Sequence, residues 1–582
     1  MRTLVLCLLG LLLCTCGPGP RSADPPPPNV LFILTDDQGI GDLSLAGNDS
    51  IRTPHLDRLL RRGVRFERFY VSPVCAPTRA SFLSGQYAPR TGAIFVTRRQ
   101  ETMDDAVVTL PEYLKRAGYR TGLFGKWHNG ATFPYHPAGQ GFDEFLGFTL
   151  GHLNDYFVGE LRNEHDEAVP FQGDLTGILT DSAAHFMLNS DAPFFCMLAY
   201  QAPHTPVQVA DRYWDGVAAR GLTDYNTGIY AMVESVDDRV GRLLDTLSEA
   251  GLLDNTLVIF ASDNGPNGDR YRRGLRGTKG HVDEGGVRVP FGLLMPGADP
   301  ANGRVVDTPA AHVDLLPTVL DYLGLPVPDG LDGISLLPLL RGDTLADRYV
   351  YAFGQGPVYT GYPGSMRDAR YLYVARDSLS DELYDLRDDP GQQTDIYGRP
   401  GTPGRRMRES YRDVAAGIGR PDRVAPPIDL DAGEGTVRLL AHEGEPLGNT
   451  HFSDPYGWAN DFFVNVDDRG AYWPVVLDSA ARFAVTVRYH LDAPDPLTIS
   501  VSVSEAASLT PTLPVAVTET LPVHDRVPRK EVLPRGWAVR QVGEITVPAG
   551  EHRLRISGSG GSAGSALWIK EVDLRRVEAG EG

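Results

Sequence analysis

The sequence predicts an α/β fold for most of the chain and an all-β domain at its C-terminal end. Apolar runs at residues 29–34, 194–200 and 257–260 are typical of parallel strands buried on both faces of a central sheet. Residues 230–250 carry apolar side chains at helical spacing, so we expect helices to flank that sheet. After about residue 429, alternating β-rich runs separated by Gly/Pro-rich turns predict a β-sandwich.

Length, composition and charge are those of a large globular protein. The chain has 582 residues, of which 42% are hydrophobic and 22% charged, enough for several domains with sizeable cores. Its net charge of −20 argues against nucleic acid as a partner. Only Cys75 and Cys196 lie outside the N-terminal leader, so no disulfide framework is expected. Cys196 lies in an apolar run and is predicted to be core.

The N-terminus has the pattern of a signal peptide, which we place at residues 1–23. A basic start is followed by an apolar run at residues 4–13, too short to span a bilayer in the mature chain. Cys16 lies in a loose lipobox and is a candidate lipid anchor; the alternative is simple cleavage near Ala23. Residues 24–28 form a proline-rich spacer. The protein is therefore expected to be exported, as a periplasmic, cell-surface or secreted protein.

Oxygen-bearing side chains follow two of the predicted central strands. Asp36 and Asp37 come directly after residues 29–34, and Asp263 and Asn264 follow the run at 257–260. If these strands are neighbours, their carboxyl ends converge, where ligands bind in open α/β sheets. Three carboxylates and one amide oxygen suit a hard divalent cation, Ca²⁺ or Mg²⁺. An ordinary acidic loop is the alternative, and no Cys/His cluster suggests zinc.

The segment Cys75-Ala-Pro-Thr-Arg79 has the chemistry of an oxyanion site. Pro77 suits the first turn of a helix, which places Cys75 at the helix N-terminus, where free N–H groups favour an anion. Arg79 would lie one turn further on the same side and could donate to a group bound beside the cysteine. The alternative is a buried cysteine beside an ordinary helix start.

Three other segments carry cationic or imidazole side chains. Lys126 and His128 follow a short predicted strand at 121–124, and two prolines flank a loop that holds His204. Lys279 lies in residues 275–290, a Gly/Lys/Arg-rich stretch predicted to be a loop that can hold an anion. Taken singly, each has an ordinary alternative, a solvated lysine or a packed histidine.

Together these segments resemble the type I, formylglycine-dependent sulfatases, an arylsulfatase-like family of the alkaline phosphatase superfamily. The resemblance covers residue 29 to about 395. Thr78, Asn129 and the stretch 281–283 depart from the usual pattern without replacing a catalytic position. The matching motifs, in order, are Asp36-Asp37, Cys75 to Gly92, Gly125 to His128, Ala202 to His204, Ser262 to Gly265, Lys279 before Glu284, Arg288 to Pro290, Val313 to Thr318, Asp332 to Leu340, Arg367 to Tyr371 and Glu382 to Pro390.

The resemblance implies an alkaline-phosphatase-like fold, with a central mixed sheet flanked by helices. We expect a catalytic domain at 29–340 and a smaller subdomain at 341–425, with a short antiparallel sheet and a helix near 405–418. The predicted β-sandwich at 426–582 lies outside the resemblance. Its tryptophans are either sugar-stacking platforms or, more commonly, core residues; they are Trp473, Trp537 and Trp568.

The resemblance also assigns roles within the site. Cys75 would be converted to formylglycine, and Ca²⁺, or less expectedly Mg²⁺, would be held by formylglycine 75 with Asp36, Asp37, Asp263 and Asn264. Arg79 and Lys126 would hold and activate the aldehyde hydrate, which His128 would deprotonate. His204 and Lys279 would bind sulfate, together with Lys126, and protonate the leaving oxygen.

The expected reaction is hydrolysis of sulfate esters, on a sulfated small molecule or glycan. A formylglycine-generating maturation enzyme is then an implied partner. Residues 151–155 and Arg276 are candidates for the substrate pocket. Two alternatives remain open at this point: a phosphonate or phosphate monoester hydrolase of the same superfamily, and a non-catalytic glycan-binding protein in which Cys75 is never matured.

Overall fold

A computed structural model of the chain describes residues 26–420, 423–431, 435–559 and 565–577. The predicted signal peptide and Cys16 lie outside the described residues. Among the helices of the described residues, none is both long enough and apolar enough to cross a membrane.

The centre of the molecule is an eleven-stranded mixed sheet. Five neighbouring strands in it are parallel, and antiparallel strands extend it on both sides, so the predicted mixed α/β sheet is confirmed. The parallel strands are, in spatial order, β8 (Thr256–Ser262), β1 (Asn29–Thr35), β7 (Phe194–Ala199), β3 (Arg120–Lys126) and β4 (Glu144–Phe148). Beyond β8 lie β9 (Arg288–Leu294), β2 (Val64–Tyr70), β10 (Val305–Val306) and β11 (Ala310–Ala311); beyond β4 lie β5 (Val158–Asn163) and β6 (Ala168–Gln172).

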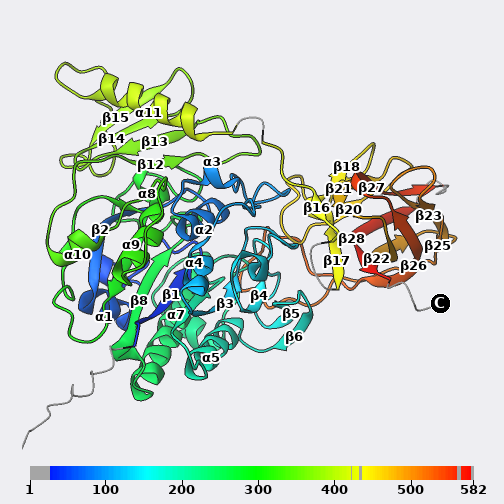
Figure 1. Ribbon diagram of the computed structural model, residues 1–582, viewed down its shortest axis with the longest axis horizontal. Coiled ribbons are helices and arrows are strands. Elements are labelled where there is room, and N and C mark those ends of the chain that lie inside the picture. Colours follow the sequence, from blue (N-terminus) through cyan, green and yellow to red (C-terminus); the bar gives the residue numbers. More distant parts are fainter. Residues whose placement is uncertain (1–25, 421–422, 432–434, 560–564, 578–582) are drawn as a thin grey trace, which may run out of the picture.

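Helices cover both faces of this sheet, because the side chains of each buried strand alternate between two cores (Figure 1). In β1, Val30 and Phe32 join one core, while Leu31 and Ile33 join the other. The first core also takes side chains from α2 (Cys75–Ser84), α4 (Leu110–Arg116), α9 (Leu315–Tyr322) and α10 (Leu337–Arg341). The second takes them from α1 (Pro54–Arg62), α5 (Leu175–Leu188), α6 (Asp211–Ala218) and α7 (Asp224–Glu249), the last being the predicted long amphipathic helix.

A second, four-stranded antiparallel sheet follows the central one in sequence. Helix α11 (Gly404–Ile418) packs Met407 and Tyr411 against it, in agreement with the expected small sheet and helix. The short helix α3 (Ala88–Thr91) lies next to Tyr87, which belongs to the same core. The strands are β12 (Val350–Phe353), β13 (Gly364–Arg367), β14 (Tyr371–Ala375) and β15 (Asp381–Asp385).

The C-terminal part contains two sheets that share one core, as a β-sandwich requires. Trp473 is completely buried there and donates its indole N–H to the Leu440 carbonyl at 2.7 Å, so this tryptophan is a core residue. Trp568 stacks on His490, and only Trp537 lines a cavity shared with the catalytic domain. The principal strands are β16 (Ile428–Asp429), β21 (Ala471–Leu477), β27 (Gly550–Ser559) and β23 (Leu497–Ser502) in one sheet, and β20 (Phe463–Val464), β28 (Ala566–Arg576), β22 (Ala481–Asp492) and β26 (Ala538–Val547) in the other.

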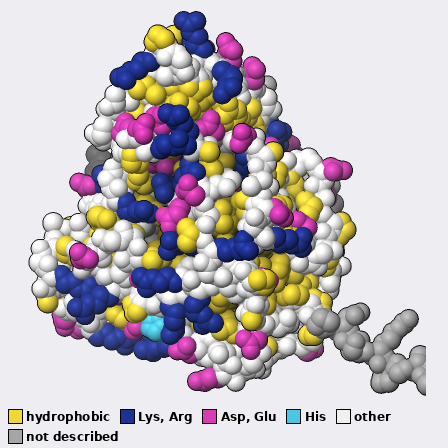
Figure 2. Space-filling model, turned by 90° about the vertical axis from the view of Figure 1, so that its left-hand side faces the viewer, with side chains coloured by type: hydrophobic (Ala, Val, Ile, Leu, Met, Phe, Trp, Pro, Cys, Tyr) yellow, Lys and Arg dark blue, Asp and Glu magenta, His cyan; other side chains and the backbone are white. Residues whose placement is uncertain are grey.

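Figure 2 shows Lys and Arg side chains spread over one face of the molecule, with Asp and Glu side chains between them. A cavity of about 440 Å³ is lined by several arginines. Three of them are paired with acids: Arg68 with Asp307, Arg273 with Glu67, and Arg288 with Glu284. This pairing offsets most of the positive charge around the cavity.

Candidate active site

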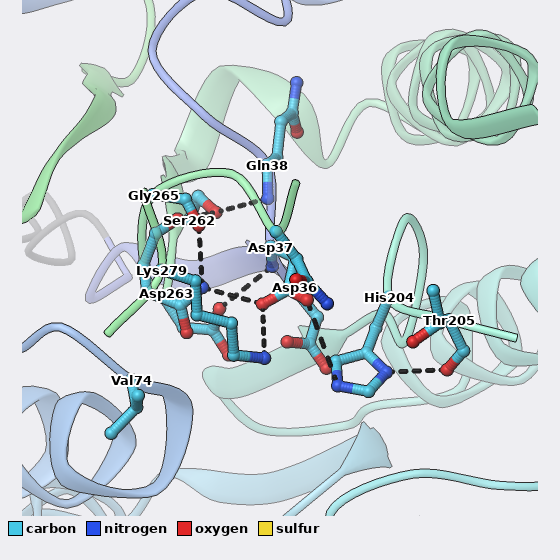
Figure 3. A network of polar contacts seen from close by, with 12 residues as sticks. Asp36, Asp37, Gln38, Val74, His204, Thr205, Ser262, Asp263, Gly265 and Lys279 are labelled. Carbon is cyan, nitrogen blue, oxygen red and sulfur yellow. Dashed lines mark hydrogen bonds and ion pairs between the residues drawn. The ribbon is translucent and has the colours of Figure 1, made fainter. Parts of the chain in front are cut away.

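The ends of β1 and β8 bring the predicted cation ligands together. These strands are parallel neighbours in register, with Thr35 opposite Ser262, so the residues that follow them meet at one edge of the sheet. The side chains of Asp36, Asp37, Asp263 and Asn264 are at most 1% exposed. Figure 3 shows the aspartates clustered, with Lys279 and His204 turned toward Asp37.

The oxygen atoms of this cluster fit a divalent cation. Three buried atoms accept no hydrogen bond from any described residue: Asp36 Oδ1, Asp37 Oδ2 and Asn264 Oδ1. Ligand atoms of Asp36, Cys75 and Asp263 all lie within 4.8 Å of one another. Buried oxygens without a proton donor are costly unless something else satisfies them, and hard oxygen ligands are those that Ca²⁺ and Mg²⁺ prefer.

Each carboxylate of the cluster also has a cationic neighbour. Lys126 Nζ lies 2.6 Å from Asp36 Oδ2, and Lys279 Nζ lies 2.6 Å from Asp37 Oδ1. Burial raises the pKa of Asp263 to about 6, and the charge of Asp36 adds to the rise. Burial also opposes ionisation of Asp37, but Lys279 and His204 hold the pKa of Asp37 below its usual value.

Cys75 is the first residue of α2, as the position of Pro77 predicts. All ten residues of this helix are buried, and Cys75 is 2% exposed. Burial raises the pKa of its thiol, which therefore stays protonated at neutral pH. The hydroxyl of Thr78 donates back to the carbonyls of Ser72 and Val74, so it is satisfied within the helix start.

Arg79 lies on α2 next to the cluster, and three of its five N–H donors bond to the protein. Its Nε and Nη2 donate to Asp263 Oδ2 at 3.0 and 2.8 Å, and Nη1 donates to the Lys126 carbonyl at 2.8 Å. The sequence predicts that Arg79 can donate to a group bound beside Cys75, and this role stays a prediction. In the structure Arg79 also positions a candidate cation ligand and the end of β3.

His128 is a neutral imidazole with one free nitrogen. Its Nε2 donates to the Val96 carbonyl at 2.9 Å, which leaves Nδ1 buried without a partner among the described residues. Burial, with the neighbouring Lys126 charge, keeps the pKa of His128 well below its usual value. The residue is in the left-handed region, with φ of 66°. An unprotonated Nδ1 of this kind can accept a proton.

His204 and Lys279 are the most exposed of the predicted catalytic and cation-binding residues, at 12% and 18% of their side chains. His204 donates from Nδ1 to the Thr205 carbonyl at 2.6 Å, and its Nε2 lies 3.9 Å from Asp37 Oδ2. Burial, followed by the charge of Lys279, lowers the pKa of His204 to about 4. These two side chains therefore line the open side of the cluster.

The stretch 275–290 was predicted to be a loop throughout, which is wrong for its last part. Helix α8 (Glu284–Val287) contains Gly285 and Gly286, two poor helix formers. A Cβ at Gly286 would lie 2.0 Å from the His281 carbonyl oxygen. The backbone therefore packs too closely here for any larger residue, and this close packing overrides helix propensity.

Sequence patterns did not single out His152, although it lies in the predicted pocket stretch 151–155. Its ring stacks on that of His204, with 5.7 Å between ring centres, and it is 5% exposed. Its Nε2 is buried without a partner among the described residues. Arg276 lies further out, donating to the Tyr384 hydroxyl at 2.6 Å, and a role for it in the pocket stays a prediction.

Comparison with known proteins agrees with this geometry. A family model described as Sulfatase matches residues 28–325, and one described as N-sulphoglucosamine sulphohydrolase, C-terminal, matches residues 278–408. Steryl-sulfatase of Mus musculus is 34% identical, over 59% of this chain and 69% of its own length. N-acetylgalactosamine-6-sulfatase of Canis lupus familiaris is 34% identical, over 59% of this chain and 71% of its own length.

The fold is also similar to that of a solved structure. The crystal structure of Ps i-CgsB in complex with k-i-k-neocarrahexaose is 27% identical, covers 69% of this chain and 95% of its own, and superposes with a TM-score of 0.63. The expected resemblance is thus confirmed, and with it the class of enzyme. The chain belongs to the sulfatase family and is a sulfuric ester hydrolase.

Proposed function

We propose that the protein hydrolyses sulfate esters of carbohydrates, using a formylglycine formed from Cys75 and a bound Ca²⁺. The observation that carries this proposal is the position of Cys75. It lies at a helix N-terminus, with its sulfur within 4.8 Å of ligand atoms of Asp36 and Asp263.

An unmodified cysteine is poorly suited to the task. Thiolate is the reactive form, and burial raises the Cys75 pKa. A hydrated aldehyde at this position would supply two hydroxyl groups, one to attack sulfur and one to be deprotonated when sulfate is released. Lys126 and the N–H groups at the start of α2 favour negative charge on these oxygens.

His128 is the base in this proposal. Its Nδ1 is unprotonated and unpartnered, because Nε2 donates to Val96, so it can take the proton whose removal releases sulfate. Arg79 keeps Asp263 in place, and its remaining N–H groups would help Lys126 hold the aldehyde hydrate. His204 and Lys279, on the open side, bind the sulfate group. The proton for the leaving oxygen comes from the Lys279 ammonium, or from His204 when its Nε2 carries a second proton in addition to the one that Nδ1 donates to Thr205.

The proposed cation is held by Asp36, Asp37, Asp263 and Asn264, together with residue 75. When bound, it would polarise the sulfate and lower the pKa of the attacking hydroxyl. Ca²⁺ is favoured over Mg²⁺ because Ca²⁺ accepts many protein oxygens, whereas Mg²⁺ usually keeps several waters and few carboxylates.

A carbohydrate substrate is supported by the relative described as N-acetylgalactosamine-6-sulfatase and by the structure that contains k-i-k-neocarrahexaose. Export, lipidation at Cys16, a maturation enzyme and the domain boundaries at 340 and 425 stay predictions of the same proposal.

The test combines a mass measurement with kinetics. Protein from a host able to mature such cysteines should give a tryptic peptide 69–79 with the mass of an aldehyde in place of the thiol. Cys75→Ala should lower kcat/KM on 4-nitrophenyl sulfate at least a thousandfold. Cys196→Ala, at the other cysteine of the described chain, is the matched control and should stay active.

Two outcomes would contradict the proposal. One is an unmodified Cys75 in fully active protein. The other is a higher kcat/KM on 4-nitrophenyl phosphate or a phenylphosphonate monoester than on the matched sulfate, which would assign the site to the phosphate or phosphonate alternative. Release of sulfate from sulfated oligosaccharides then tests the substrate class.

A further inference from the structure

The C-terminal sandwich extends a segment back to the catalytic domain (Figure 1). Between β25 (Thr512–Leu513) and β26 the chain leaves the sandwich core, and residues 524–531 lie against the active-site loops. We call residues 524–531 the crossing segment. The part of the chain described by the two sulfatase family models ends at residue 408, so this segment lies outside both.

The crossing segment is fixed to the loop after β7, which carries His204. Its Arg526 donates a backbone N–H to the Val207 carbonyl at 2.9 Å. Gln208 donates to Asp525 Oδ1 at 2.9 Å. These are the kinds of backbone and charge-assisted hydrogen bonds that dock one domain on another with a defined geometry.

The same segment is fixed to the loop that carries His152. His524 Nδ1 lies 3.0 Å from Asp155 Oδ2, and Arg529, which is 4% exposed, donates to the Asn154 carbonyl at 2.9 Å. A second sandwich residue, Asn460, donates to the carbonyl of His152 itself at 2.7 Å. The two stacked histidines are therefore both carried on loops held by the sandwich.

One contact reaches His204 most directly. The Thr205 hydroxyl donates to the carboxylate of Glu531, and the Thr205 carbonyl accepts the Nδ1–H of His204 at 2.6 Å. His204 and Thr205 can be followed in Figure 3. Glu531 thus holds the residue whose backbone orients the imidazole. Nδ1 keeps its proton on the Thr205 carbonyl, so Nε2 is the nitrogen that can carry a second proton to the leaving oxygen.

We propose that Glu531, through Thr205, is a positioning residue for His204. The β-sandwich would then help to build the active site on the side where the alcohol leaves. This inference rests on the proposed role of His204 as proton donor to the leaving oxygen. It adds that a domain outside the family models controls how well that proton is delivered. Esters whose alcohol leaves poorly, as sugar alcohols do, depend most on this control.

The test measures how strongly the rate depends on the leaving group. Phenolate is a stronger base than 4-nitrophenolate and needs the proton more. Thr205→Val and Glu531→Gln should each lower kcat/KM about tenfold on phenyl sulfate but no more than about twofold on 4-nitrophenyl sulfate. Thr205→Ser keeps the hydroxyl and should restore the wild-type ratio, and the double variant should lose no more than either single one.

Glu551→Gln, at an exposed glutamate of the same sandwich, is the matched control and should change neither rate. Equal losses on the two esters, or no loss on phenyl sulfate, would overturn the positioning role, because a purely structural defect does not discriminate between leaving groups.

Hydrogen–deuterium exchange separates this inference from the proposed function, because it needs no turnover. Amides of residues 203–209 should exchange faster in Glu531→Gln than in wild type, and unchanged exchange would overturn the inference. If the wild-type protein turns over neither ester, the proposed function fails, while faster exchange in the variant still supports the sandwich as the element that orders the His204 loop.

Discussion

The floor and the rim of the candidate site are built in different ways. The floor consists of fully buried groups at strand ends and on α2, such as Asp36, Lys126 and Arg79, each paired within one domain. The rim consists of His204 and Lys279, which are partly exposed and lie on loops, and the His204 loop is held by a second domain. In the proposed mechanism, the floor carries the groups that every substrate needs, whereas the loops of the rim can change without rebuilding the sheet.

The largest effect is expected from breaking the floor. Asp263→Asn removes a candidate cation ligand and leaves the buried Arg79 guanidinium without its anion. Breaking a buried pair in this way costs about 3–5 kcal/mol of unfolding free energy. We also expect kcat/KM to fall at least a thousandfold, and equally on phenyl and 4-nitrophenyl sulfate, in contrast to the rim variants.

Denaturant unfolding measures the loss of stability, and kinetics on phenyl and 4-nitrophenyl sulfate measure the loss of kcat/KM. Asp269→Asn, at an aspartate whose side chain is 91% exposed, is the control for the same chemical change. If Asp263→Asn kept wild-type stability, or kept wild-type kcat/KM on one of the two esters, the floor would not differ from the rim in the way described.

Removal of the cation should have a smaller effect on stability than Asp263→Asn, and again should affect both esters. Chelation should abolish turnover of both esters, and Ca²⁺ should restore it. Calcium at a hundred times its dissociation constant would stabilise the fold by about 2.7 kcal/mol, seen as a rise in the midpoint of thermal unfolding. Asp36→Asn should remove most of this rise. A rise that survives in this variant, or that Mg²⁺ matches at equal concentration, would contradict the proposed Ca²⁺ site.

The smallest expected effect is on the pH dependence of stability, and it comes from the buried acids where the sandwich meets the catalytic domain. Burial raises the pKa of Glu443 to about 8, with the charge of Glu101 adding to the rise, and burial raises the pKa of Glu101 to about 7. The folded state binds these protons more tightly than the unfolded state. Stability from them is therefore fully present below about pH 4.5 and is lost as pH rises toward 8.

Glu443→Gln should flatten this decline, by at most about 1.4 kcal/mol per pH unit. Unfolding by denaturant at pH 6 and pH 8 compares the variant with wild type, and Glu551→Gln is again the exposed control. A variant with an unchanged slope between these pH values would show that the interface does not take up the proton at Glu443.

Local sequence patterns predicted the floor better than the rim. The run before Asp36 and the run before Asp263 each predicted a buried strand, and the convergence of parallel strand ends then placed their acids together. The apolar pattern predicted a strand that ends at residue 124, which is two residues too early. Strand β3 continues to Lys126, which is fully buried because Asp36 neutralises it, and a lone lysine gives no sign of such a partner.

Contacts between distant segments could not be predicted in this way. Arg79 is 184 residues from Asp263, and Thr205 is 326 residues from Glu531. Periodicity reports which face of an element is buried, but not which remote side chain docks on it. The sandwich strands were predicted from their alternation, whereas the crossing segment has no such pattern, and so the contacts of the sandwich with the His204 loop emerged only from the structure.

If Cys75 is converted to formylglycine as proposed, the burial of α2 requires that the conversion precede folding. All ten of its residues are inside the folded molecule, so an enzyme that converts Cys75 could not grip this segment once the sheet and helices have closed over it. Maturation would then compete with folding for the same nascent chain. A molecule that folds before Cys75 is converted would be stable yet permanently inactive. The active fraction of a preparation would then equal the fraction of chains converted before they folded.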